Sequence, residues 1–150
     1  MRAVIQRVNK ASVEVDNTII GKIDEGLLVL IGIENEDSKQ DAEWLASKIV
    51  KMRVFADNTG LMNLDITDIN GELLVISQFT FFASTKKGNR PSFINSAKPD
   101  IAIPLYNYFL QFIKNQLNIP VKSGIFGADM KVSLVNNGPV TIIIDTKKKE

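Results

Sequence analysis

The most informative stretch of this 150-residue sequence is LLVISQFTFF, residues 73–82. Its apolar first half predicts a buried strand, which we expect to run to residue 82. Ser77, Gln78 and Thr80 then follow among aromatic residues. Polar side chains at the mouth of a buried strand must find hydrogen bonds or serve a ligand. Because open α/β sheets bind small molecules at the carboxyl ends of strands, we expect a site here.

The rest of the chain predicts an α/β fold in which strands outnumber helices. Alternating or continuous apolar runs predict extended segments at residues 2–8, 12–16, 19–23, 26–33, 73–82, 121–126, 130–136 and 139–145. Helical spacing predicts two main helices, one starting at a capping box on Ser38 and one carrying Leu105 to Ile113, with Pro104 in its first turn. This pattern favours layered mixed or antiparallel sheets, partly barrel-like, in a single domain over residues 1–150.

Composition excludes several kinds of partner and site. The 18 basic and 17 acidic residues nearly cancel, so no strong overall field attracts nucleic acid or membrane. Histidine and cysteine are both absent, which excludes Ser-His and Cys-His pairs, thiolate metal sites and histidine-ligated zinc. No apolar run approaches the roughly 20 residues of a transmembrane helix, and the start lacks the apolar core of a signal peptide. We therefore expect a cytoplasmic protein.

Three interpretations of the polar stretch after residue 76 remain open. In the first, its hydroxyls only satisfy neighbouring backbone. In the second, Thr80 or Ser77 is a nucleophile, but a hydroxyl needs an adjacent base and the sequence offers neither histidine nor a Ser-x-x-Lys spacing. In the third, the backbone N–H groups of Phe79 and Thr80 bind an oxyanion or carbonyl while the side chains position the substrate.

Residues 136–141, NNGPVT, also allow two interpretations. Asn-Gly between two extended runs indicates a hairpin turn. Alternatively, Gly138-Pro139 forms a tip that carries bare carbonyl oxygens into a pocket, and Gly-Pro admits a cis bond at modest cost.

Two further groups of residues are candidates for binding. Lys86, Lys87 and Arg90 form a basic cluster in the long irregular stretch 83–98, and they are either solvated or in contact with phosphate. Phe126 and Met130 lie among small residues, which either line a pocket or mark a bulge.

The whole chain resembles the D-aminoacyl-tRNA deacylases, the D-tyrosyl-tRNA deacylase family. Seven ordered motifs carry this resemblance, at residues 1–8, 26–30, 62–64, 77–80, 87–93, 126–130 and 137–141. One departure is Phe81-Phe82, where family members often have Leu-Tyr.

The resemblance implies an enzyme that hydrolyses the ester joining a D-amino acid to the 3′ end of tRNA, as chiral proofreading in translation. Glycine mischarged on tRNA-Ala is implied as a further substrate. The resemblance implies that the protein is a homodimer. It also implies that Gly138-Pro139, which matches the family's cis Gly-Pro, enters the partner's site and excludes L-aminoacyl-tRNA. No DNA or membrane partner, metal or cofactor is implied.

The resemblance also implies roles for individual residues. The catalytic floor of the pocket is matched by Ser77, Gln78, Phe79 and Thr80, and its lining by Phe126 and Met130. Lys86, Lys87 and Arg90 become candidate contacts to the tRNA acceptor stem. The rival classes are an RNA-binding module without chemistry, which would bind tRNA without releasing the amino acid, and a small-molecule-binding protein, which would not bind tRNA.

Overall fold

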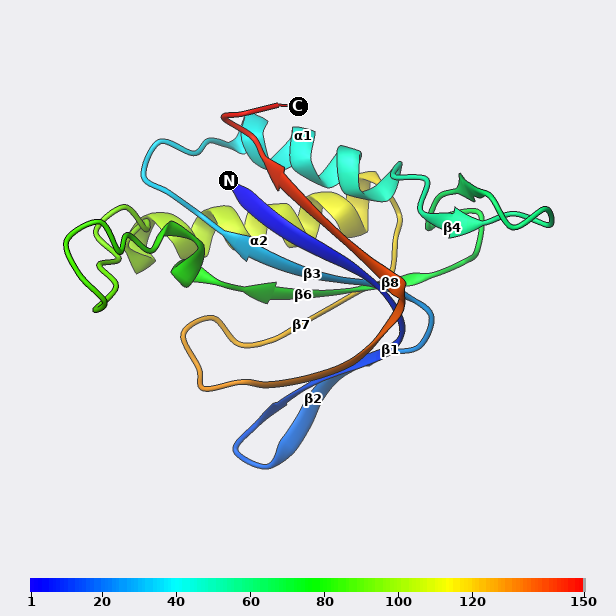
Figure 1. The fold of residues 1–150 in the computed structure, drawn as a ribbon, viewed down its shortest axis with the longest axis horizontal. Helices are drawn as coiled ribbons and strands as arrows, with labels where there is room; N and C mark the ends of the chain where they lie inside the picture. The colour runs from blue at the N-terminus through cyan, green and yellow to red at the C-terminus, as the bar shows by residue number, and fades with distance from the viewer. Residues whose placement is uncertain (150) are drawn as a thin grey trace.

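A computed structural model describes residues 1–149, in which two helices cover one face of a curled sheet (Figure 1). The strands are β1 (Arg2–Val15), β2 (Thr18–Ile23), β3 (Gly26–Gly32), β4 (Phe55–Ala56), β5 (Met62–Leu64), β6 (Glu72–Ser77), β7 (Val121–Ser123) and β8 (Lys131–Asp145). The helices are α1 (Lys39–Val50) and α2 (Pro99–Gln116). A short 3₁₀ helix at Phe79–Phe82, here called the 79–82 turn, follows β6.

The main sheet is mixed and has the order β2-β1-β3-β6-β7, with β8 on the other edge of β1. β1 is antiparallel to β2, β3 and β8, whereas β3, β6 and β7 run parallel to one another. α1 and α2 lie in the connections from β3 to β6 and from β6 to β7, as parallel neighbours require. β4 and β5 form a separate small sheet. The predicted α/β class with a mixed, partly barrel-like sheet and two main helices is confirmed.

Two apolar cores lie on opposite faces of the sheet, and this explains why β6 is apolar throughout. Leu73 and Val75 pack in the core beneath the helices, while Leu74 and Ile76 pack in a second core inside the curl of the sheet. Alternate residues of a strand point to opposite faces, so a strand between two cores needs no polar face. Each fully buried side chain of this size contributes about 1.5–3 kcal/mol relative to exposure.

Both helices begin with signals that the sequence contains. The predicted capping box at α1 is present, because Ser38 Oγ accepts from the Asp41 amide and the Asp41 carboxylate accepts from the Ser38 amide. In α2 the first-turn proline is Pro99, so the prediction for Pro104 is wrong, and Pro104 lies inside the helix. No helix within residues 1–149 is long and apolar enough to cross a membrane.

The predicted extended segments differ from the observed strands in several places. The segments expected at 2–8 and 12–16 form one strand, β1, and the segment expected at 121–126 ends at Ser123. The strand expected to reach residue 82 ends at Ser77, where the chain enters the 79–82 turn. The hairpin expected at 136–141 is absent, since β8 runs on through this stretch. Both halves of β8 pair with β1, and four residues of β8 bulge opposite the single residue Arg7.

We expect stability to fall in acid because three carboxylates, Asp41, Asp57 and Asp145, are stabilised as anions. Hydrogen bonds from Thr59 and Asn63 lower the pKa of the exposed Asp57. Burial opposes the ionisation of Asp41 and Asp145, but hydrogen bonds from Lys147 to both, from Ser38 to Asp41 and from Arg2 to Asp145 outweigh it and hold both pKa values below their usual range. The folded chain therefore binds fewer protons than the unfolded chain, whose aspartates titrate near ~3.9. The free energy of unfolding should be constant above about pH 5 and decrease as the pH falls through about 4. Urea unfolding across this range measures it, and an Asp41→Asn variant that keeps the full acid slope would contradict the assignment.

Candidate functional site

The 79–82 turn begins where the β6 ladder stops. The Gln78 amide donates to Ile31 O of β3 at 2.7 Å, and the chain then coils so that Phe82 enters the core at 3% exposure. Phe79 instead stays 55% exposed and packs edge-on against Phe93, with 5.0 Å between ring centroids. One aromatic anchors the turn, and the other lies at the surface of the site.

Two backbone N–H groups of the turn donate no hydrogen bond within residues 1–149. They are the amides of Phe79 and Thr80. The Thr80 hydroxyl accepts from Gln78 Nε2 at 2.5 Å, and Ser96 Oγ donates to Phe79 O at 2.7 Å. Preorganised N–H groups of this kind stabilise negative charge on a carbonyl oxygen. The turn therefore leaves two backbone donors available to a ligand.

A cavity of about 240 Å³ opens beside the turn. Its walls come from the end of β6, the turn, and the segment between β7 and β8: Ile76, Ser77, Gln78, Phe79, Phe126, Gly127, Ala128, Asp129, Met130 and Val132. The structure thus brings Ser77, Gln78 and Phe79 together with Phe126 and Met130 around one cavity. Thr80 adjoins this group through its hydrogen bond to Gln78.

The far wall of the cavity is held by the core. Phe126 packs edge-on against Tyr106 of α2 at 5.8 Å between centroids, and the buried Tyr106 hydroxyl donates to Val75 O at 2.9 Å. Burial raises the pKa of Tyr106, so its phenol stays protonated at neutral pH. Gly124 leaves room for Met130, because a Cβ there would lie 2.3 Å from the Met130 sulfur.

No carboxylate or amine within residues 1–149 accepts a hydrogen bond from the Ser77 or Thr80 hydroxyl. Asp129 is the cavity's one titratable lining residue within residues 1–149, and its side chain is 87% exposed. That carboxylate accepts from Lys131 Nζ at 2.7 Å, a bond that raises the pKa of Lys131. Within residues 1–149, no cluster of three or more acidic side chains is arranged to hold a metal ion.

Gly138-Pro139 forms the bulge of β8, is exposed and has a cis peptide bond. Arg7 holds the bulge by donating from Nε to Asn137 O at 3.0 Å and from Nη1 to Val54 O. At φ +132°, Gly138 also leaves no room for a Cβ, which would lie 2.9 Å from Arg7 Nη2.

The chain's own bulge does not line its own cavity. The bulge lies opposite Arg7, which pairs with Leu27 of β3, which in turn pairs with Leu73 of β6. From Leu73 to Ser77 is four residues, about 13 Å along the strands, and β8 is three strand spacings from β6, about 14 Å. Gly138 and Pro139 are accordingly not among the residues that line the cavity.

Lys86, Lys87 and Arg90 are exposed in the loop after the turn. Ser84 and Ser92 pair through backbone hydrogen bonds of 2.8 and 2.9 Å and close the base of this loop. The basic residues therefore lie on the loop outside the cavity.

Sequence reasoning missed two contacts to the turn, from Ser96 and from Arg2, whose Nη1 donates to Phe81 O at 2.9 Å. Both come from segments distant in sequence. Arg2 is recognisable in the sequence as a charged residue at the start of a predicted strand, but only the strand register shows that it contacts the turn.

Comparison with known proteins identifies the family. The model of the family described as D-Tyr-tRNA(Tyr) deacylase matches residues 4–145. The chain belongs to the D-Tyr-tRNA(Tyr) deacylase family. Among curated members, the D-aminoacyl-tRNA deacylases of Flavobacterium psychrophilum and Cytophaga hutchinsonii are 58% and 59% identical over 150 residues, 100% of each chain.

Two solved structures share this fold. One, described as c-Myc DNA Unwinding Element Binding Protein, is 38% identical with a TM-score of 0.89, and the match covers 97% of this chain and 98% of that one. The other, a probable eukaryotic D-amino acid tRNA deacylase, is 16% identical with a TM-score of 0.78 over 95% and 97%, which shows the fold alone. Family membership confirms the predicted resemblance and the predicted enzyme class, a D-aminoacyl-tRNA deacylase among the carboxylic ester hydrolases.

Proposed function

We propose that this protein hydrolyses the ester bond of D-aminoacyl-tRNA to free amino acid and tRNA, and that it also acts on glycine mischarged on tRNA-Ala. L-Aminoacyl-tRNA is spared, so the reaction is chiral proofreading in translation. The working form is a homodimer in the cytoplasm, and it uses no metal or cofactor.

One observation carries this proposal. The backbone N–H groups of Phe79 and Thr80 donate no hydrogen bond, and they lie beside a cavity of about 240 Å³. An aminoacyl ester is an activated acyl group, so a polarised carbonyl and a positioned water suffice for hydrolysis. The ester carbonyl accepts from the two amides, which stabilise the oxyanion as water adds. Ser77 and Gln78 orient the substrate.

The remaining proton transfers need no protein base. The 2′-hydroxyl of the terminal ribose lies beside the ester and assists the attacking water, and the leaving 3′-oxygen takes the proton. This route is consistent with a chain that contains no histidine or cysteine and with a Thr80 hydroxyl already engaged by Gln78.

Chirality is read by backbone supplied in trans. Gly138-Pro139 of one copy enters the cavity of the other and places carbonyl oxygens where the side chain of an L-amino acid would project. A D side chain points away, and glycine has none, so both are accepted. Rejection by a steric clash with rigid backbone is independent of which amino acid is attached.

The tRNA itself is bound outside the cavity. Lys86, Lys87 and Arg90 lie on the loop that follows the turn, next to where the acceptor end would enter. Cationic side chains there contact the phosphates of the acceptor stem without reading sequence.

The first test compares matched D- and L-aminoacyl-tRNA. We expect the D ester to be lost at least about 100-fold faster than the L ester, since one steric clash of a few kcal/mol has that effect on rate. Glycyl-tRNA-Ala should also be hydrolysed. Release of the amino acid is followed with radiolabelled substrates, and equal slow loss of both enantiomers contradicts the proposal. Binding of tRNA without ester loss indicates the RNA-binding module, and no binding indicates the small-molecule-binding protein.

The second test separates backbone catalysis from a hydroxyl nucleophile. Thr80→Val removes the hydroxyl and keeps the backbone amide, so we expect kcat to stay within about tenfold of the unmodified protein. Loss of an essential nucleophile would reduce kcat by several orders of magnitude. Single-turnover kinetics with a D-aminoacyl-tRNA measure the difference, and complete loss of activity establishes the nucleophile instead.

The third test asks whether Gly138-Pro139 acts in trans. Ala128→Trp fills the cavity but leaves the bulge intact, whereas Gly138→Ala distorts the bulge and leaves the cavity intact. Each variant alone should be inactive on D-aminoacyl-tRNA or unable to reject the L ester. Mixed dimers formed by co-refolding should recover about a quarter of the selective activity, because half the dimers carry one complete site of two. No recovery in a mixture shown to contain heterodimers means that the bulge does not act in trans.

A further inference from the structure

We propose that Arg2 is a positioning residue for the reaction, holding the 79–82 turn so that its amides keep the direction that oxyanion stabilisation requires. This inference rests on the proposed function for its kinetic consequence. Its structural content, that Arg2 orders the turn, stands on contacts within this chain.

The 79–82 turn has little support of its own. It is a single 3₁₀ turn without a side-chain N-cap, and short 3₁₀ segments have poor hydrogen-bond geometry. The Phe81 amide reaches Gln78 O only at 3.4 Å, while the Ala83 amide bonds to Thr80 O at 3.0 Å. Contacts from outside must therefore fix its peptide planes.

Arg2 supplies such contacts at the end of the turn. Its Nη1 donates to Phe81 O at 2.9 Å, and its guanidinium carbon lies 4.6 Å from the centroid of the buried Phe82 ring. A planar guanidinium can donate to a carbonyl and stack on a ring together, which an ammonium cannot reproduce. Ser96 holds Phe79 O at the other end, so the turn is fixed on both sides of the free Thr80 amide.

The strand register places Arg2 within reach of the turn. Arg2 stands opposite Gly32 of β3, and the turn lies directly on Gly32, where a Cβ would be 3.0 Å from both Gln78 O and Phe81 Cβ. The missing side chain lets the turn approach the sheet at the position next to Arg2.

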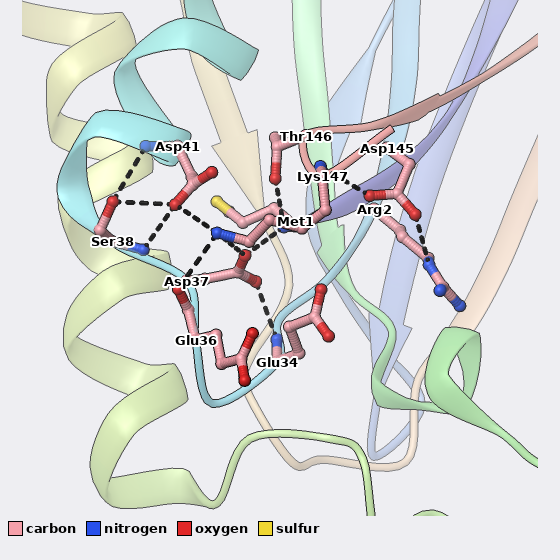
Figure 2. Close-up of polar contacts among 10 residues, drawn as sticks. All are labelled: Met1, Arg2, Glu34, Glu36, Asp37, Ser38, Asp41, Asp145, Thr146 and Lys147. Atoms are coloured by element: carbon pink, nitrogen blue, oxygen red, sulfur yellow. Dashed lines mark hydrogen bonds and ion pairs between the residues drawn. The ribbon is translucent and has the colours of Figure 1, made fainter. Parts of the chain in front are cut away.

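The Arg2 guanidinium is itself held by Asp145, as Figure 2 shows. Its Nε donates to Asp145 Oδ2 at 2.9 Å, across the β1–β8 ladder. Asp145 also accepts from the Lys147 amide at 2.9 Å, and Lys147 Nζ donates to Asp41 at the start of α1 at 3.0 Å. The guanidinium therefore has one donor on a fixed carboxylate and another on the turn, which restricts where it can lie.

This arrangement predicts a particular kinetic signature. Arg2 is not among the residues that line the cavity at the turn, so its loss should leave ground-state binding of the substrate largely unchanged. Misdirected amides would instead stabilise the transition state less, which lowers kcat. Displacements on the scale of 1 Å reduce rates by about 100-fold.

The experiment compares Arg2→Met and Arg2→Lys with the matched control Arg53→Met. Arg53 is exposed and makes no hydrogen bond or ion pair within residues 1–149. We expect both Arg2 variants to lose about ten- to a hundredfold in kcat on D-aminoacyl-tRNA with KM within about twofold, and the control to be unchanged. A loss confined to KM that grows with salt would mean that Arg2 contacts tRNA phosphate, and full activity of Arg2→Lys would mean that charge alone matters. Either result overturns the proposal.

Amide hydrogen exchange separates failure of this inference from failure of the proposed function. In Arg2→Met, exchange of the Phe81 and Ala83 amides, which donate the hydrogen bonds of the turn, should rise at least about tenfold, with β6 and α1 unchanged. If exchange is faster in Arg2→Met but the unmodified protein hydrolyses no aminoacyl-tRNA, Arg2 does order the turn and the proposed function is wrong. Unchanged exchange and unchanged kcat, in a protein whose unmodified form is active, would reject the positioning role.

Discussion

The fold depends on the pairing of both edges of β1. β8 pairs with one edge over almost the whole strand, while β3 and then β2 pair with the other. A strand with both edges satisfied can be long and curled without exposing unpaired backbone, and the sheet bends into a partial barrel around the second apolar core. The same pairing sets distances between sites. It brings the start of β1 and the end of β8 beside the end of β3, and therefore beside the 79–82 turn.

Backbone groups carry most of the proposed chemistry, and this shifts importance to residues that look structural. In the proposed mechanism, the amides of Phe79 and Thr80 would serve as donors, and the carbonyls of Gly138-Pro139 would serve as a filter. A backbone group cannot be tuned by its own side chain, so its direction depends on whatever packs around it. That explains why a chain without histidine or cysteine can still present a preorganised site, and why contacts such as Ser96 Oγ to Phe79 O belong to the functional description.

The sequence predicted those features that are determined locally or by hydrophobic pattern. β3 and β6 were recognisable as strands apolar on both faces, and Ser38 with Asp41 marked the start of α1. The 79–82 turn was not predicted, because aromatic residues favour strands, whereas burial of Phe82 and the contacts from Arg2 and Ser96 are tertiary. The expected hairpin failed for a related reason, since the free edge of β1 pairs with both flanks of Asn137-Gly138 and overrides the local turn preference. Five of the ten residues that line the cavity were candidates from their motifs. The Arg2 and Ser96 contacts depend on register and tertiary packing, which single-sequence patterns do not contain.

β1 also connects the two halves of the proposed site through two arginines. Arg2 donates to the carbonyl that ends the 79–82 turn, and Arg7 donates to Asn137 O at the bulge. The five-residue spacing is odd, so in this regularly paired part of β1 the two side chains leave opposite faces of the sheet. Each arginine thus holds an irregular backbone segment that the ladder cannot hold, one that would polarise the ester and one that would exclude the L side chain. The two segments lie apart within one copy, so a dimer in which each bulge meets the other's turn would combine, at every site, the Arg2 region of one copy's β1 with the Arg7 region of the other's.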